Sequence, residues 1–335
     1  MRTAALLLVL LLALLLAACA NSPGSQPEEK PVVWPLAPDP PRIAYVRSVE
    51  KPGDLGISRG FLGHLADFLF GAEENRLVRP MAVVESGGIL YVADPGVRGV
   101  HRFDPVAGDY RLIRGLSSPV GLARGSGGTV YVADSRLGRV LAIAPDSEEA
   151  RPLELDSPLT QPTGIAFDPA AGRLFVADTA AHCIKVFDRG GRLVRTLGRR
   201  GTGEGEFNYP TFLWLAVDGR LFVTDSLNFR IQVLDAAGAF LGKFGRAGDG
   251  SGDAARQKGV ATDRFGHVYV TDALFNAVQI FDGSGRFLLA IGAQGGERGE
   301  FRLPAGIFIA EDDTVYVADS YNRRVQVLRY VGGAQ

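Results

Sequence analysis

The chain has 335 residues, 46% of them hydrophobic, and its 36 basic and 37 acidic side chains give a formal net charge of −1. This length supports a large apolar core, and the balanced charge argues against the broad basic excess of nucleic-acid-binding proteins. The only two cysteines are Cys19 and Cys183, which limits the disulfides that can form.

The first eighteen residues have the pattern of a cleaved secretory signal. Arg2 supplies a short positive region, and an almost unbroken apolar run follows from Leu6 to Leu16. Such a run is too short to span a bilayer comfortably as a mature helix, so we interpret residues 1–18 as a signal peptide. Its removal takes away Arg2 alone and leaves 35 basic and 37 acidic residues, a net charge of −2.

The residues Leu16-Ala17-Ala18-Cys19 resemble a bacterial lipobox, in which the cysteine receives lipid and becomes the new N-terminus. Several acyl chains, each contributing about 0.8 kcal/mol per buried CH2, would make the anchor effectively permanent. Ala20 in place of an acidic residue resembles the outer-membrane address of lipoproteins in Gram-negative bacteria. We therefore expect an extracytoplasmic, lipid-anchored protein in which Cys183 has no disulfide partner. The alternative is an ordinary signal peptide with a cysteine near its cleavage site.

Residues 19–41 are rich in proline, with seven prolines from Pro23 to Pro41. This composition favours extended polyproline geometry over a packed core, so we expect a semi-rigid tether. Apolar residues at helical spacing predict a short amphipathic helix over residues 60–70. We expect this helix to pack on the domain; a lid or a partner-docking helix is the alternative.

A five-residue phrase, consisting of an aliphatic residue, Tyr or Phe, Val, Ala or Thr, and Asp, occurs six times. The intervals between its aspartates are 40, 44, 47, 47 and 47 residues. A repeat of this length, made of short β-rich pieces, is typical of a propeller with four-stranded blades. We therefore predict an all-β, six-bladed propeller over residues 42–331. The phrases end at Asp94, Asp134, Asp178, Asp225, Asp272 and Asp319.

The fourth repeat predicts strands over 212–217, 221–225, 231–234 and 239–244, separated by turns rich in Gly and Asp. The repeated aspartate comes at the end of the second strand, where its carboxylate can accept backbone N–H groups of the following turn. We interpret all six aspartates as structural turn caps and not as catalytic acids.

Residues 225–235 (Asp-Ser-Leu-Asn-Phe-Arg-Ile-Gln-Val-Leu-Asp) and 319–328 (Asp-Ser-Tyr-Asn-Arg-Arg-Val-Gln-Val-Leu) resemble the NHL repeat. The runs 203–210 and 296–304, each containing Gly-Glu-Phe and ending in Pro, do so as well. The resemblance covers about residues 79 to 330 and is weaker in the first two repeats. It implies a six-bladed NHL-type β-propeller.

The sixth repeat has room for three strands only, between Ile307 and Val331. An unfilled outer position would leave backbone groups unpaired at a seam. Residues 42–49 form an isolated apolar strand, and we expect this strand to pair with the last blade and close the ring.

Propeller topology places the turns after the repeated aspartates on the same face as the long connections 198–209, 245–258 and 292–303. Arginines lie beside apolar side chains there, including Arg98, Arg136, Arg139, Arg199 and Arg200, a composition typical of protein-binding hot spots. The alternative is that these side chains pack between blades and that the arginines are only solvated. The candidate partner-binding residues are Arg230, Arg323, Arg324, Leu227, Phe229, Leu274, Phe275 and Tyr321.

The residues offer no clear catalytic or metal-binding constellation. The four histidines are scattered, and the expected innermost strands contain hardly any polar ligands. His182 and Cys183 are adjacent on a strand and therefore point to opposite faces. We expect no cofactor and no metal.

Taken together, these features predict a monomeric, lipid-anchored scaffold that binds an exported or envelope protein and no nucleic acid. The alternative is a propeller enzyme, such as a lactonase, lyase or hydrolase, that acts on a carbohydrate or cell-envelope substrate.

Overall fold

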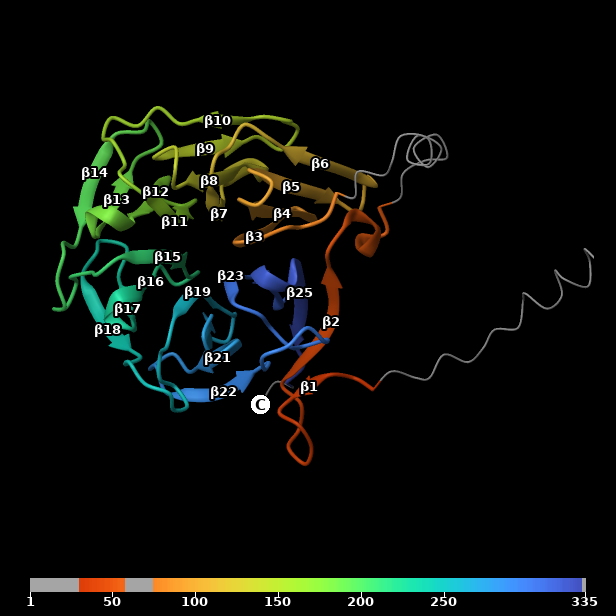
Figure 1. Cartoon of the computed structure of the whole chain (residues 1–335). Helices are drawn as coiled ribbons and strands as arrows, with labels where there is room; N and C mark the ends of the chain where they lie inside the picture. Colours follow the sequence, from red (N-terminus) through yellow and green to blue (C-terminus); the bar gives the residue numbers. More distant parts are fainter. Residues whose placement is uncertain (1–29, 58–74, 333–335) are drawn as a thin grey trace, which may run out of the picture. The chain divides into compact units, whose positions relative to one another are not determined.

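The structure, a computed structural model, describes residues 30–57 and 75–332. The expected signal peptide, Cys19 and the expected helix over 60–70 lie outside these ranges. Val33–Gln335 form one compact unit, whose described part consists of antiparallel sheets and short 3-10 turns. Six sheets surround a common centre (Figure 1), so the predicted six-bladed propeller is confirmed. No helix within the described ranges is long and apolar enough to cross a membrane.

Each blade runs from an innermost to an outermost strand, and the blades follow one another around the ring in chain order. Blade 1 contains β3 (Ala82–Ser86), β4 (Ile89–Asp94), β5 (Gly99–Asp104) and β6 (Asp109–Ile113). Blade 2 contains β7 (Pro119–Arg124), β8 (Val130–Asp134), β9 (Arg139–Ile143) and β10 (Ala150–Pro152). Blade 3 contains β11 (Pro162–Asp168), β12 (Arg173–Asp178), β13 (Cys183–Phe187) and β14 (Leu193–Leu197).

Blade 4 contains β15 (Pro210–Leu215), β16 (Leu221–Asp225), β17 (Arg230–Leu234) and β18 (Phe240–Phe244), within two residues of the strands predicted from the sequence. Blade 5 contains β19 (Gln257–Thr262), β20 (Val268–Asp272), β21 (Ala277–Phe281) and β22 (Phe287–Ile291). The inner strands of blade 6 are β23 (Pro304–Ile309), β24 (Thr314–Asp319) and β25 (Arg324–Tyr330).

The outer strand of blade 6 comes from the N-terminal part of the chain. Strand β2 (Ile43–Val49) pairs antiparallel with β25, with Ile43 opposite Tyr330 and Val49 opposite Val325. This pairing confirms the predicted closing strand. A two-residue strand, β1 (Val33–Trp34), pairs with the other edge of β2. The expected tether over 19–41 therefore has to be shortened, because its residues 33–34 belong to the sheet of blade 6.

The blades are held together by apolar contacts and by close approach of their inner strands. Every residue of β16, β17, β20 and β21 is buried, because each blade packs between two neighbours. A Cβ atom at Gly121 would collide with the carbonyl oxygen of Thr163 on the next inner strand, and one at Gly164 with that of Thr211. Glycine at these two positions lets neighbouring inner strands touch, and this closes the ring tightly around its centre.

The closing strand provides a direct test of the fold. Val49 is fully buried and Val46, in the same strand, is 40% exposed. We expect Val49→Asp to lower the free energy of unfolding by more than about 3 kcal/mol, because it buries a carboxylate without a partner. The control Val46→Asp should cost less than about 1 kcal/mol. Urea denaturation followed by circular dichroism measures both, and equal midpoints would contradict the pairing of β2 with β25.

Candidate functional site

The six turns that follow the repeated aspartates lie on one face of the propeller, which we call the aspartate face. Side-chain hydrogen bonds attach two of the long connections to these turns. The Asn228 amide donates to the carbonyl of Gly201 at 2.9 Å, and the Asn322 amide donates to the carbonyl of Gly295 at 2.8 Å. The connections therefore share a face with the turns, as the topology predicts.

The repeated aspartates are fully buried and have a shared role that the sequence interpretation missed. Asp94 accepts backbone N–H groups from Val78 at 2.6 Å and Arg79 at 3.0 Å, in the segment that leads into the inner strand of the same blade. Each of the other five carboxylates accepts equivalent bonds from residues 16–18 positions earlier. In every blade the aspartate therefore connects the segment that enters the innermost strand to the end of the second strand.

Capping of the following turn occurs in only three of the six blades. Asp94, Asp134 and Asp272 accept N–H groups two or three residues ahead, as expected of a turn cap. Asp178, Asp225 and Asp319 instead precede short 3-10 turns, which carry no side-chain cap among the described residues. The turn-cap interpretation is wrong for these three blades, because charged or amide side chains occupy their carboxylate oxygens instead.

Arg230 and Arg324 are two of these side chains, and this overturns their assignment to a binding surface. Arg230 is 8% exposed; its Nε donates to Asp225 at 2.8 Å and its Nη atoms donate to backbone carbonyls of the 198–209 connection. Arg324 is 6% exposed and makes the same bonds to Asp319 and to the 292–303 connection. Both guanidinium groups neutralise a buried carboxylate and hold a loop, so neither is available to a partner.

A polar residue seven positions after the aspartate completes these networks. Gln232 and Gln326 donate to the oxygens of Asp225 and Asp319 at 3.0 Å, and the Lys185 ammonium lies 3.5 Å from Asp178. In blade 1 the corresponding residue is His101, whose Nε2 lies 3.6 Å from Asp94, beyond hydrogen-bond length. Although burial raises the pKa of Asp94, its contacts with His101 and with backbone N–H groups outweigh burial and lower that pKa. The fixed offset of seven residues was the sequence signal for these partners.

Three other candidate residues are exposed at equivalent positions, two residues after the aspartates of blades 4, 5 and 6. Leu227 is 52% exposed, Leu274 54% and Tyr321 63%. Phe229 and Phe275 are half-buried beside them, and Arg323 is exposed. Leu227, Leu274 and Tyr321 form what we call the apolar arc, which spans three consecutive blades.

Exposed arginines also lie on the aspartate face, in several blades. Arg199 is bound to Glu206 and Arg246 to Asp253, so their charges are partly neutralised. Other exposed arginines on this face have no ion pair with any described residue; they include Arg98, Arg136, Arg139, Arg200, Arg256, Arg302 and Arg323. The aspartate face therefore carries several exposed guanidinium groups as well as the apolar arc.

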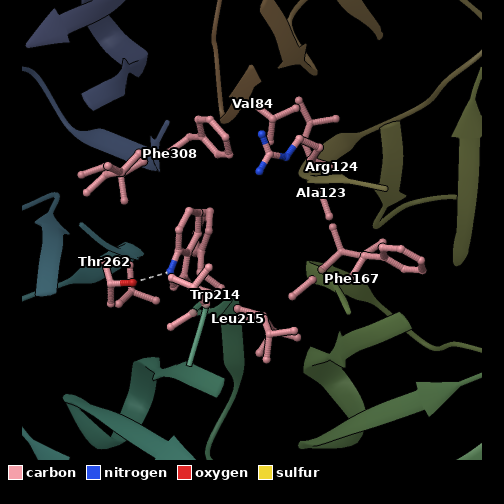
Figure 2. A pocket seen from close by; sticks show the side chains of 18 of the residues that line it. Val84, Ala123, Arg124, Phe167, Trp214, Leu215, Thr262 and Phe308 are labelled. Carbon is pink, nitrogen blue, oxygen red and sulfur yellow. Dashed lines mark hydrogen bonds between the residues drawn. The ribbon is translucent and has the colours of Figure 1, made fainter. Parts of the chain in front are cut away.

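A cavity of about 650 Å³ lies at the centre of the ring and is lined by inner strands of all six blades. Its lining extends into the turns that follow those strands, such as Pro169 and Asp218, so it lies toward the face opposite the aspartate face. Figure 2 shows the Trp214 indole inside it, donating to the Thr262 hydroxyl at 2.9 Å. The Trp214 ring meets Phe308 edge to face, with the centroids 5.8 Å apart. The sequence analysis did not identify this cavity, although Trp214 in an innermost strand was the available signal.

The thiol of Cys183 and the imidazole of His182 are both buried within the protein. Cys183 is buried, and burial together with the Asp178 carboxylate raises the pKa of its thiol, which disfavours the nucleophilic thiolate. His182 accepts the backbone N–H of Tyr209 at its Nδ1, at 3.2 Å. Across residues 30–57 and 75–332, no three His, Cys, Asp or Glu side chains are grouped so that they could hold a metal ion.

Arg323 and Arg324 are adjacent in blade 6, but Arg324 is buried and Arg323 is exposed. Substituting each one therefore tests the buried ion pair and the surface separately. We expect Arg324→Ala to lower the free energy of unfolding by about 3–5 kcal/mol, because it leaves the buried Asp319 without its counter-charge. Arg323→Ala, one residue away and exposed, should stay within about 0.5 kcal/mol of the unmodified protein. Urea denaturation of both variants measures the difference, and a small effect of Arg324→Ala would show that the buried pair is dispensable.

Comparison with known proteins supports the fold. A family model for the NHL repeat matches residues 159–187, and one described as a 6-bladed beta-propeller matches residues 260–330. No curated protein has a significantly similar sequence.

Several solved structures share the fold at low sequence identity. Virginiamycin B lyase from Staphylococcus aureus is 16% identical, over 77% of this chain and 97% of that one, with a TM-score of 0.57. An auxiliary nutrient binding protein from Bacteroides thetaiotaomicron is 12% identical, over 78% and 71%, with a TM-score of 0.62. A chain of a nidogen–laminin complex is 20% identical, over 71% and 84%, with a TM-score of 0.54. The chain is therefore a six-bladed β-propeller in which residues 159–187 match the NHL repeat.

Proposed function

We propose that this propeller is a protein-binding scaffold whose partner docks on the aspartate face. The observation that carries the proposal is the apolar arc, in which three side chains more than half exposed stand at the same position of three consecutive blades. Large apolar side chains on a rigid surface are typical anchors of protein interfaces, since little conformational entropy is lost when they are covered.

The charge on the aspartate face indicates the chemistry of the partner. Exposed arginines without an ion pair among the described residues lie on the same face as the arc, so we expect carboxylates on the complementary surface. Those in or leading into blades 4 to 6 include Arg200, Arg256, Arg302 and Arg323.

The same proposal places the scaffold outside the cytoplasm, on the outer membrane of a Gram-negative bacterium, with lipid on Cys19. The support is the lipobox-like run that ends at this cysteine and the alanine that follows it. The partner is then an exported or envelope protein. Because propellers of this fold include both binding proteins and lyases, the fold alone does not choose between binding and catalysis.

Substitution in the apolar arc tests the docking face. We expect Leu274→Asp and Tyr321→Asp each to reduce recovery of the partner at least tenfold in a detergent pull-down from the native envelope. The reason is that each puts a charge into a desolvated, apolar contact. Val106→Asp, at a 90% exposed position between β5 and β6, is the matched control and should leave recovery unchanged. Equal recovery with all three variants would exclude this face.

Removal of Cys19 tests the anchor. We expect Cys19→Ser to move the protein from the membrane fraction to the soluble extracytoplasmic fraction and to abolish incorporation of labelled palmitate, because the thiol is the proposed site of lipid attachment. Cys183→Ser is the control and should keep both properties. Membrane retention of the Cys19→Ser protein would contradict lipid anchoring without affecting the docking face.

A further inference from the structure

We propose that the central cavity is a second binding site, which takes an amphipathic organic anion with an apolar body and a carboxylate group. The apolar body would lie against Trp214 and Phe308, and the carboxylate would bind the Arg124 guanidinium. This site faces away from the aspartate face and does not depend on the proposed scaffold function.

The size and lining of the cavity fit an apolar molecule. Its volume of about 650 Å³ falls within the range of about 300–1,000 Å³ typical of sites for small organic ligands. The side chains in its wall are mainly aliphatic or aromatic, and the hydroxyl of Thr262 is already engaged by the Trp214 indole. Water gains few side-chain hydrogen bonds in such a space, so an apolar group displaces it favourably.

The cavity also has a defined shape. The hydrogen bond to Thr262 and the edge-to-face contact with Phe308 fix the Trp214 ring on one side. Figure 2 shows smaller side chains, Val84 and Ala123, across the cavity from this ring. The arrangement leaves a flat aromatic surface facing open space, which suits a flat or extended apolar body.

The mouth of the cavity carries the carboxylates of Asp168, Asp218, Asp263 and Glu311 and the guanidinium groups of Arg124 and Arg264. Asp168 accepts backbone N–H groups of its own turn, Asp218 binds Arg220, and Asp263 binds both His267 and Tyr269. Arg264, a cation at the mouth, is paired with the 5%-exposed Asp313 at 2.8 Å. These contacts hold the four groups in place, but the hydrogen-bonded carboxylates keep their negative charge, so the attraction for an anion depends on Arg124.

Arg124 is the exception. It lies at the end of β7 beside the cavity (Figure 2), and its partner among the described residues is Glu311, 2.9 Å away in blade 6. The side chain of Glu311 is 85% exposed, and an ion pair this exposed contributes little. A ligand carboxylate whose apolar body is held in the cavity can therefore replace Glu311 on the guanidinium, and a planar bidentate contact favours that exchange.

Tryptophan fluorescence gives a direct test, because the chain contains only Trp34 and Trp214. In the exported chain carrying Cys19→Ser and Trp34→Phe, purified without detergent, Trp214 is the sole indole reporter. The probes are 1-pyrenebutyrate and its uncharged analogue 1-pyrenebutanol. We expect saturable energy transfer from Trp214 to both probes, with the carboxylate bound at least tenfold more tightly.

Variants of residues that line the cavity distinguish the contribution of the Arg124 charge to binding from that of the apolar wall. Arg124→Gln should weaken pyrenebutyrate at least tenfold and leave pyrenebutanol within twofold, whereas Glu311→Gln should tighten pyrenebutyrate by freeing the guanidinium. Ala123→Phe should abolish binding of both probes by filling the cavity, with circular dichroism as the check on folding. If that variant does not fold, the Arg124→Gln comparison alone decides. Absence of saturable transfer, or equal loss of both probes in Arg124→Gln, would overturn the proposal.

Discussion

The fold depends on one buried interaction repeated six times, the carboxylate that joins the second strand of a blade to the chain entering its first. An ionised carboxylate without partners is costly to bury, so each aspartate is stable only when several N–H donors converge on it. In blades 4 and 6 an arginine, an asparagine and a glutamine converge as well, and their other bonds hold the long connections. The electrostatic requirement of one side chain thereby organises both the blade and the loop above it.

This organisation explains why the aspartate face is a suitable platform for recognition. The backbone N–H of Leu274 donates to the Asp272 carboxylate, and those of Leu227 and Tyr321 donate to the carbonyls of Asn208 and Arg302, so the arc residues project from fixed backbone. Substitution at those positions changes the surface with little effect on the blade. The exposed residues of the turns can therefore change while the buried carboxylate contacts stay the same, as is usual for loops on a rigid scaffold.

The sequence predicted the regular part of the molecule well and the chemistry of its surface less well. Strand spacing and the repeated phrase gave six blades and the closing strand, because both follow from alternation and backbone pairing that any local stretch reveals. The roles of Arg230 and Arg324 depend on contacts with residues more than twenty positions away, and an arginine next to a turn is read from sequence as exposed. Trp214 was missed for the same reason, since its partners Thr262 and Phe308 belong to other blades.

The pairing of β2 with β25 also constrains how the protein is made. Strand β2 is synthesised before all five complete blades and its partner β25 after them, so their contact has nearly the largest sequence separation that the described chain allows. The entropy of closing so long a loop rises only with the logarithm of its length, but contacts this distant slow folding. Blade 6 can be completed only after the whole ring has been synthesised, and until then the edge of β2 that pairs with β25 is open to other strands. The pairing of β2 with β25 thus closes the propeller, and it is also the step of folding at which incorrect strand pairing is easiest.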